Sequence, residues 1–248
     1  MLPDITIVTT TWFPDDERGK ARLTTAEMAV CSWAENLRYD GRIFLHIADD
    51  GSHDLDSFEV LGEIWNKDWL LTQQDRCGVG ASLNAGFTRA FERSLLAFYI
   101  VDDWELKQPL DISPWVQLLL TNESIGVVRL GIAHPDLTGV VRHCPETGEY
   151  YLLLDRHHYA FAHRPALYHK RFIDAYGPFE ENVNAFECER EYNERFAAQA
   201  VYTAEKGAVE IGPDIALALL HSWRHISDIE LADVEPSLEK CEHDLSCS

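Results

Sequence analysis

Apolar runs alternate with amphipathic stretches of helical period through the first half of the chain. The strand-like runs are "ITIVTTTW", "RIFLHIADDGS", "WLLTQQ" and "LLAFYIVDD". The helical stretches that lie between them are "TTAEMAVCSWAENLRY" and "GASLNAGFTRAFERS". Strands that alternate with helices are typical of α/β domains, so the pattern predicts a mostly parallel sheet flanked by helices.

The first helix has a recognisable start and an apolar stripe. Thr24 or Thr25 can cap its N-terminus, since a threonine hydroxyl accepts a hydrogen bond from the free N–H groups of the first turn. Apolar residues follow at a spacing of three and predict the face that packs on the sheet. These residues are Met28, Cys31, Ala34 and Leu37.

The pattern is less regular after residue 106. Residues 134–155 are typical of antiparallel strands around the turn "PETGE", which predicts a smaller antiparallel region beside the main sheet. A helix is expected over residues 187–200, and strands are expected before the "GPD" turn and at "IALALL". These elements form one domain over residues 1–227, and the acidic residues 228–248 are expected to be a surface tail.

Charge and hydropathy narrow the classes of function. The formal net charge is −21, from 42 acidic and 21 basic side chains, and it disfavours extensive binding to nucleic acid or to anionic membranes. The longest apolar runs are too short to cross a bilayer, and no leader-like segment starts the chain. We therefore expect a soluble cytoplasmic protein with no membrane span.

Two of the predicted strands end in adjacent carboxylates. Asp49 and Asp50 follow one strand, and Asp102 and Asp103 follow another. Ligands of parallel α/β sheets bind beyond the carboxyl ends of the strands, and a divalent cation bound with substrate phosphates offsets the repulsion between neighbouring carboxylates. The pairs predict a metal and nucleotide site, whereas ordinary turn chemistry is the alternative for each pair alone.

Four segments, "ITIVTTTW", "ADDGS", "GVGASLNAGF" and "YIVDDWEL", resemble the GT-A fold glycosyltransferases, specifically the family 2-like group of inverting enzymes. The similarity spans most of residues 5–225. It implies a GT-A fold and the transfer of a hexosyl or pentosyl group from a nucleotide-diphosphate sugar, with UDP-sugars favoured, to a hydroxyl acceptor. It also implies Mn²⁺ or Mg²⁺ as the cofactor.

The resemblance assigns roles to these segments. Asp50 takes the place of the acid that binds the donor base, and "YIVDDWEL" takes the place of the DxD motif. Val101 stands where a first acid is common, so Asp103 becomes the leading metal ligand and Asp102 its helper. The nucleotide contacts implied are Thr9, Thr10, Thr11, Asp50, Asn84 and Asp102.

The segment "YGPFEENVNAFECEREYNERF" resembles the region that carries the catalytic base. Aligning Arg195 with the family's arginine makes Glu189 the expected base, with Glu187 as the competitor and Cys188 at an acidic position of the motif. Direct attack on an anomeric carbon needs a carboxylate that accepts the proton of the acceptor hydroxyl. The alternative is a charged helix face with pairs such as Glu191 and Arg195.

A histidine after the last strand is implied as a third contact to the metal or the diphosphate. The resemblance favours His221, with His225 in reserve. A packed histidine is the alternative at this position.

Residues 155–172 form a basic and aromatic stretch in an otherwise acidic chain. In the family this region faces the acceptor, and basic groups among aromatic rings also suit a flipped or single-stranded base. Small enzymes that this chain resembles glycosylate hydroxymethylated bases of phage DNA, so the resemblance suggests such a base as the acceptor and otherwise a glycan. A solvated edge strand and loop is the alternative interpretation. The acceptor contacts expected are Arg156, His163, Arg164 and Trp104.

Two other functions stay open on the sequence. Val101 and Cys188, at motif positions that often carry acids, are compatible with a noncatalytic nucleotide-sugar-binding protein of the same fold. A nucleotidyltransferase is the third hypothesis, although "TTTWFPDDERGKAR" lacks a glycine-rich, lysine-containing phosphate loop.

Overall fold

The structure is a computed structural model that describes most of the chain. The described residues are 1–54, 56–131, 138–144, 148, 150–155, 161–206, 214–219 and 223–226. The helices are α1 (Glu17–Asn36), α2 (Asp56–Trp65), α3 (Val79–Arg93), α4 (Ser113–Thr121), α5 (Lys170–Tyr176) and α6 (Ala185–Lys206). The strands are β1 (Ile5–Thr11), β2 (Leu37–Arg38), β3 (Ile43–Asp49), β4 (Trp69–Gln73), β5 (Leu96–Tyr99), β6 (Trp104–Leu106), β7 (Leu110–Asp111), β8 (Ile125–Gly131), β9 (Gly139–His143), β10 (Tyr150–Leu154), β11 (Ala166–His169), β12 (Asp214–Leu219) and β13 (Trp223–His225).

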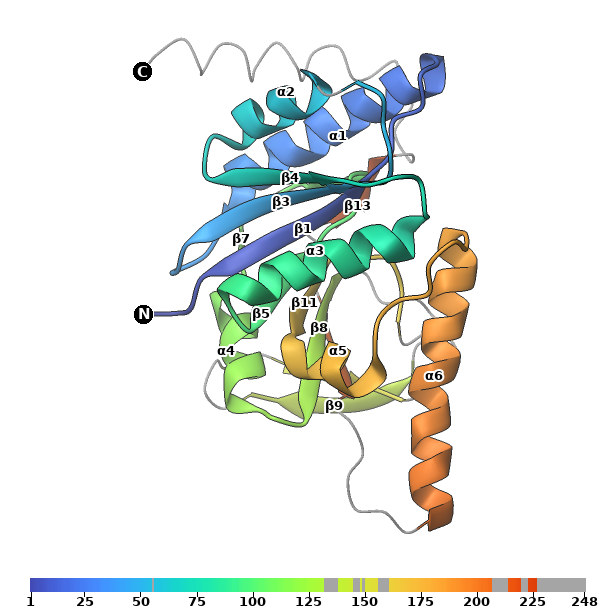
Figure 1. The fold of residues 1–248 in the computed structure, drawn as a ribbon. Helices are drawn as coiled ribbons and strands as arrows, with labels where there is room; N and C mark the ends of the chain where they lie inside the picture. Colours follow the sequence, from blue (N-terminus) through green and yellow to red (C-terminus); the bar gives the residue numbers. More distant parts are fainter. Residues whose placement is uncertain are drawn as a thin grey trace.

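A nine-stranded sheet runs through the molecule in the order β4-β3-β1-β5-β11-β8-β12-β10-β9 (Figure 1). Strands β4, β3, β1 and β5 are parallel, β11 is antiparallel to both of its neighbours, and β8 pairs in parallel with β12. Strands β9 and β10 form the antiparallel hairpin that the sequence predicts. The expected α/β architecture, with a mostly parallel sheet and a smaller antiparallel region, is confirmed.

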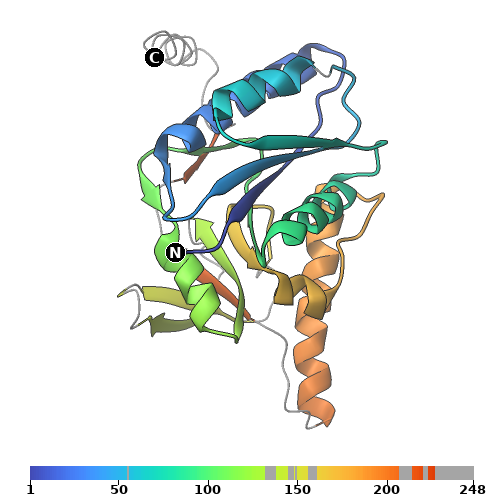
Figure 2. The same ribbon diagram turned by 60° about the vertical axis from the view of Figure 1, so that its left-hand side comes forward.

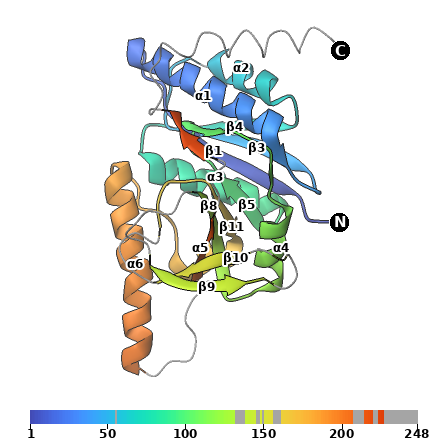
Figure 3. The ribbon, with the colours of Figure 1, turned by 180° about the vertical axis from the view of Figure 1, so that it is seen from behind.

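Helices cover both faces of the parallel half of the sheet. Helices α1 and α2 lie on one face and α3 on the other, which is clearest when the ribbon is turned (Figures 2 and 3). The two-residue period of the strands sorts their side chains between these layers. Ile5 and Ile7 of β1 pack in the cluster with α1 and α2, while Val8 packs in the cluster with α3 and α6.

Helix α1 begins earlier than the sequence predicts. Asp16 is its N-cap, and the Asp16 carboxylate accepts a hydrogen bond from the Gly19 N–H at 2.9 Å. The expected caps, Thr24 and Thr25, lie inside the helix, where their hydroxyls donate to carbonyls one turn earlier. Asp16, eight residues before Thr24, therefore caps the helix.

The buried face of α1 also differs from the predicted stripe. Of the predicted stripe, Leu37 is buried just after the helix and Met28 and Ala34 are partly buried against the core, while Cys31 is partly buried without joining it. Because α1 has 3.6 residues per turn, a spacing of three drifts around its surface, and the face that meets the sheet follows the spacings of three and four instead. The buried apolar residues of α1 are Ala26, Ala29, Val30 and Trp33.

The expected C-terminal elements are described in part. Helix α6 is longer than predicted and β12 matches the "IALALL" run within a residue. The strand expected before the "GPD" turn and the tail 228–248 lie outside the described residues. Among the described residues, no helix is both long and apolar enough to cross a membrane.

Candidate active site

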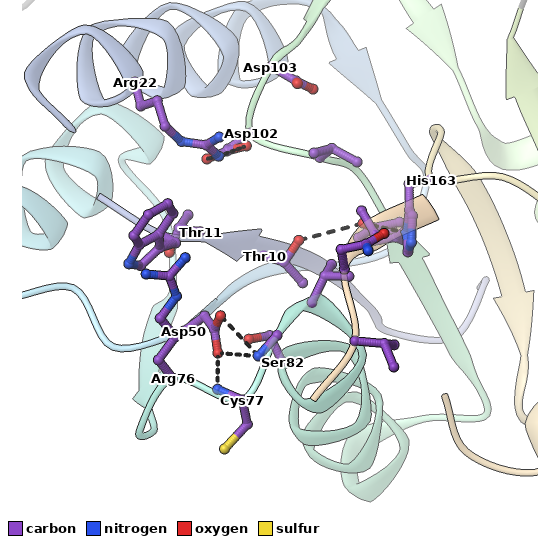
Figure 4. Close-up of a pocket in the computed structure, with 18 of the residues that line it drawn as sticks. Thr10, Thr11, Arg22, Asp50, Arg76, Cys77, Ser82, Asp102, Asp103 and His163 are labelled. Atoms are coloured by element: carbon purple, nitrogen blue, oxygen red, sulfur yellow. Dashed lines mark hydrogen bonds and ion pairs between the residues drawn. The ribbon is translucent and has the colours of Figure 1, made fainter. Parts of the chain in front are cut away.

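A cavity of about 1170 Å³ opens at the carboxyl ends of β1 and β5 (Figure 4). Its walls come from the end of β1, the first turns of α1 and α3, the segment after β5, and the loop that leads into α6. Loops diverge at the carboxyl ends of parallel strands, which leaves room for a ligand there. Both Asp50 and the pair after β5 face this cavity, as the sequence predicts.

The two acids after β3 have different tasks. Asp49 is buried and accepts hydrogen bonds from the Thr11 hydroxyl at 3.0 Å and from the backbone and side chain of Ser52 at 2.7 and 2.6 Å. Asp49 therefore performs the turn chemistry that was the alternative reading, while Asp50 reaches the cavity.

Asp50 also shapes the start of α3. Its carboxylate accepts hydrogen bonds from the backbone N–H groups of Cys77 at 2.7 Å and Gly78 at 2.9 Å. Gly78 has φ +87°, and a Cβ there would lie 2.7 Å from the Val183 carbonyl oxygen, so this position requires glycine. Asp50 thus joins the end of β3 to the start of α3, and Gly78 allows the loop before α6 to approach closely there.

Trp12 and Arg76 form a stacked pair at the cavity that the sequence reasoning missed. The Arg76 guanidinium lies 3.6 Å from the centre of the Trp12 ring, and Arg18 lies 5.4 Å from it on the surface of α1. Both Trp12 and Arg76 line the cavity, and Arg76 lies close to Asp50 in Figure 4. The sequence feature that could have indicated this pair is Trp12, an aromatic residue directly after the apolar run of β1.

Asp102 is buried and paired with a cation from α1. The Arg22 guanidinium lies 3.2 and 3.4 Å from its carboxylate oxygens. Burial, together with a smaller effect of the neighbouring Asp103, raises the pKa of Asp102 to about 7 against the opposing effect of Arg22. A buried carboxylate held at this pKa gains from any additional positive charge that binds beside it.

Asp103 lines the cavity next to the returning C-terminal segment. Its carbonyl oxygen accepts a hydrogen bond from the Ile226 N–H at 2.8 Å, and His225 of β13 pairs with Trp104 of β6. The chain after β12 therefore returns to the predicted metal position. His221 lies outside the described residues, and only the backbone of His225 is described.

The described residues contain no cluster of three side chains able to ligate a metal. Two carboxylates, Asp102 and Asp103, face the cavity together. Mg²⁺-like ions are commonly held by one or two carboxylates together with substrate phosphates and water, so this pair fits such an ion.

The first turns of α6 separate the two candidate bases. Asn184 caps the start of α6, because its Oδ1 accepts a hydrogen bond from the Glu187 backbone N–H at 3.0 Å and its Nδ2 donates to the Glu187 carboxylate at 2.8 Å. Glu189 accepts a hydrogen bond from the His163 backbone N–H at 2.5 Å, and His163 lines the cavity. Glu189 thus lies directly behind the cavity wall, whereas Glu187 is used to start the helix.

The electrostatic setting of Glu189 differs from that of a surface glutamate. Burial raises its pKa, while the His163 N–H, Arg129 and Arg164 oppose that shift. Arg129 is a buried cation within the apolar strand β8, and burial lowers its pKa to about 10. The lone charge in "IGVVRLG" was a signal that the sequence reasoning did not use.

Cys188 and Arg195, which anchored the motif alignment, are structural. Cys188 is fully buried in the cluster with α3, and burial raises the pKa of its thiol to about 12, so the thiol stays neutral. Arg195 donates to the carbonyls of Tyr176 and Pro178 at 2.9 and 2.6 Å, and lies 3.7 Å from Glu191. The expected pair on the outer face of the helix is therefore present.

The remaining nucleotide candidates divide between the cavity and the fold. Thr10 and Thr11 line the cavity, but Thr9 is buried in the sheet and does not. Asn84 does not line it either, because its side-chain amide bonds the backbone of Phe179 in both directions, at 2.8 and 3.0 Å, and Glu181 at 2.9 Å. Asn84 therefore holds the loop before α6 against α3.

The basic and aromatic stretch at 155–172 does not form one surface among its described residues. His163 and Arg164 line the cavity with Trp104, and Arg164 lies 5.9 Å from the centre of the Trp104 ring. Arg171 instead donates to carbonyls at the end of α4. Its described aromatic residues, Phe161, Tyr168 and Phe172, are buried core residues and cannot stack on a base. Arg156 lies outside the described residues.

Comparisons with known proteins support the fold. No protein-family model matches the sequence, and no curated protein matches it. Among solved structures, S. aureus TarS 1–349 matches with a TM-score of 0.56 and 11% identity, over 89% of this chain and 59% of that one. GalNAc-T7, solved with UDP, GalNAc and Mn²⁺, matches with a TM-score of 0.56 and 13% identity, over 88% and 43%.

A third match is the mannosyltransferase PcManGT from Pyrobaculum calidifontis, solved with GDP-Man and Mn²⁺. Its TM-score is 0.51 at 14% identity, over 88% of this chain and 57% of that one. The chain therefore has the GT-A fold of glycosyltransferases, as its sequence motifs suggest. It spans about three fifths of the length of the TarS fragment.

Proposed function

We propose that this protein is a metal-dependent glycosyltransferase that moves a sugar from a nucleotide-diphosphate sugar to a hydroxyl acceptor with inversion. The observation that carries the proposal is the sharing of one cavity by Asp50, the pair Asp102 and Asp103, and His163, which is hydrogen-bonded to Glu189. TarS has been solved with UDP-GlcNAc and PcManGT with GDP-Man, which supports a nucleotide sugar as the donor. UDP-sugars are the favoured class.

The charge of the cavity supports a diphosphate ligand. Arg22, Arg76 and Arg164 all line it, although the chain carries a net charge of −21. Guanidinium groups recognise phosphate oxygens through paired hydrogen bonds. This local concentration of positive charge offsets the repulsion that the acidic chain would exert on the donor.

Asp103, with Asp102 beside it, would hold the divalent ion, Mn²⁺ or Mg²⁺. When bound, the ion neutralises charge on the diphosphate leaving group. The Arg22 guanidinium holds the Asp102 carboxylate in place from the α1 side. Thr10, Thr11 and Asp50 are proposed to bind the nucleotide, and Trp12 with Arg76 offers a flat face for its base.

Glu189 is proposed to act as the general base. The acceptor oxygen forms a bond to the anomeric carbon while the bond from that carbon to the diphosphate oxygen breaks. The acceptor proton passes to Glu189, and the bonding electrons leave with the nucleoside diphosphate. A positioned carboxylate of raised pKa suits this proton transfer, because its basicity lies closer to neutral pH.

The acceptor is proposed to be a hydroxyl of a glycan in preference to a hydroxymethylated base of DNA. The described aromatic residues that suggested base recognition are buried, and the net charge of −21 opposes contact with a duplex. Trp104, His163 and Arg164 remain the proposed acceptor-side contacts, since they line the cavity next to Glu189.

A donor and acceptor panel followed by mass spectrometry tests the proposal. UDP-Glc, UDP-Gal, UDP-GlcNAc and GDP-Man are each supplied with Mn²⁺, with Mg²⁺ or with EDTA, and with glycans or hydroxymethylated DNA. Release of a nucleoside diphosphate with a glycosylated product, lost in EDTA, is the expected result. Metal-dependent binding without transfer or hydrolysis would favour the noncatalytic alternative, and release of pyrophosphate would favour a nucleotidyltransferase.

A further inference from the structure

A buried tyrosine and a histidine form a hydrogen-bonded pair on the floor of the cavity. Tyr99, the last residue of β5, is fully buried, and its hydroxyl lies 3.2 Å from His163 Nδ1 and 3.5 Å from Thr10 Oγ1. All three residues line the cavity, and Figure 4 shows Thr10 and His163 there. The pair thus connects the nucleotide end, at β1, to the segment that carries Glu189.

The hydrogen bonds of the pair favour one arrangement of protons. Burial raises the pKa of Tyr99 and lowers the pKa of His163 to about 4, so both groups are neutral at pH 7. A buried phenol donates its single hydrogen to the better placed acceptor, and Nδ1 of His163 lies closer than Thr10 Oγ1. An imidazole that accepts at Nδ1 carries its own proton on Nε2.

The Nε2 atom of His163 is therefore a buried donor on the cavity wall. It is shielded from solvent and makes no hydrogen bond of good geometry to a described residue, although the backbone of Ala185, at the start of α6, lies near the imidazole and partly opposes the lowering of its pKa by burial. A buried donor without an acceptor costs about 1–3 kcal/mol, so such atoms commonly meet a ligand or an ordered water.

We propose that the Tyr99–His163 pair is a neutral hydrogen-bond donor to a hydroxyl oxygen of the transferred sugar. The inference rests on the proposed function and moves the contact of the His163 imidazole from the acceptor to the transferred sugar, where it selects the sugar. The sugar has to lie between the diphosphate, near Asp102 and Asp103, and the acceptor oxygen near Glu189. His163 lines that interval, and its backbone N–H already binds Glu189. Tyr99 is a positioning residue, since it acts through the imidazole.

Binding measurements on three variants test the pair. Affinities for UDP and for the UDP-sugar that binds best are measured by calorimetry with Mn²⁺ at pH 6, 7 and 8. His163→Ala and Tyr99→Phe are expected to weaken binding of the UDP-sugar about 3- to 10-fold, the loss of one neutral hydrogen bond, and to leave UDP binding unchanged. His163→Gln, which keeps an N–H donor, is expected to recover part of the affinity.

Tyr168→Phe is the matched control, because Tyr168 is a buried neighbour that does not line the cavity. Deoxy analogues of the donor sugar identify the hydroxyl. One analogue is expected to lose affinity for the parent protein and for Tyr168→Phe but none for His163→Ala. The wild-type preference for the sugar is expected to be the same at pH 6 and pH 8, as a neutral donor requires.

Three results would overturn the inference. Equal losses for UDP and UDP-sugar would make the pair a support of the cavity shape only. Unchanged UDP-sugar affinity with a raised KM for the acceptor would place the contact on the acceptor. A parent protein that binds neither UDP nor any sugar nucleotide would overturn the proposed function, and this inference with it.

Discussion

Replacing Glu189 by glutamine tests the proposed base with little change in shape. Glutamine keeps the side-chain length and a carbonyl oxygen, so it can still accept the hydrogen bond from the His163 backbone N–H that Glu189 accepts at 2.5 Å. The loop at His163 should therefore stay in place, and so should its contribution to the cavity. Only the ability to take a proton is removed.

The expected loss of transfer follows from this isolated change. A positioned general base contributes about 10²–10⁴ to the rate, so kcat should fall by that factor while the Kd for the nucleotide sugar is unchanged. Burial raises the pKa of Glu189, so transfer by the parent protein should increase with pH as this carboxyl loses its proton. The Glu189→Gln variant should lack that dependence.

Glu187→Gln is the matched control because the glutamine carbonyl oxygen can still accept the hydrogen bond from Asn184 Nδ2, and the backbone N–H at position 187 still donates to Asn184 Oδ1. The assay is release of nucleoside diphosphate with acceptor at saturating donor, together with donor affinity by calorimetry and a thermal melt for each variant. If Glu187→Gln is inactive while Glu189→Gln retains full activity, the capping geometry is no guide to the base and the assignment is wrong. If both variants are fully active, the base lies outside α6.

Three further predictions concern binding and stability. Asp103→Ala should abolish the enhancement of UDP or GDP binding by Mn²⁺ without lowering the melting temperature, and calorimetry with and without EDTA checks this. Asp50→Ala should weaken nucleotide binding even in EDTA, by roughly 1.5–3 kcal/mol for a lost hydrogen bond to a charged group. Because Asp50 also accepts hydrogen bonds from the Cys77 and Gly78 N–H groups, the melting temperature of this variant should fall too. Burial lowers the pKa of His46 to about 4 from 6.5, so the folded state binds fewer protons than the unfolded state between these values. The free energy of unfolding should therefore decrease as the pH falls from 6.5 to 4. In urea titrations, His46→Gln should remove up to about 3 kcal/mol of this pH-dependent change.

The parallel half of the fold was predictable because its pattern is local. Each strand there is a short run whose alternate residues enter two different layers, and the runs of β3 and β5 are followed by carboxylates at Asp50 and Asp102. Asp50 and Asp103 could be assigned to one cavity on topology alone, since parallel strands end at the same edge. The start of α1 was missed because Asp16 precedes a polar first turn with no apolar period of its own.

The division of labour among the acids could not be read from the sequence. Asp49 and Asp50 are adjacent and chemically identical, yet one is enclosed by Ser52 and Thr11 and the other faces the cavity. Which of two neighbours turns inward depends on the exit angle of β3 and on the loop at Cys77, which comes from a distant part of the chain. The same holds for Glu187 and Glu189, which the helix places on different sides.

The buried polar groups around His163 show why a charged stretch of sequence is a poor guide to an interface. In "FAHRPALYHKRF" basic and aromatic side chains are interspersed, which resembles a binding patch. Strand β11, however, turns alternate side chains toward different neighbours. Tyr168 and Phe172 enter the core, whereas His163 and Arg164 precede the strand and remain at the cavity. The cations near Glu189 come from separate elements, Arg129 from β8 and Arg164 from the loop before β11. The packing of the sheet brings these two cations to Glu189 from distant parts of the chain. The pKa of the proposed base therefore depends on the fold and cannot be predicted from the residues next to Glu189 in the sequence.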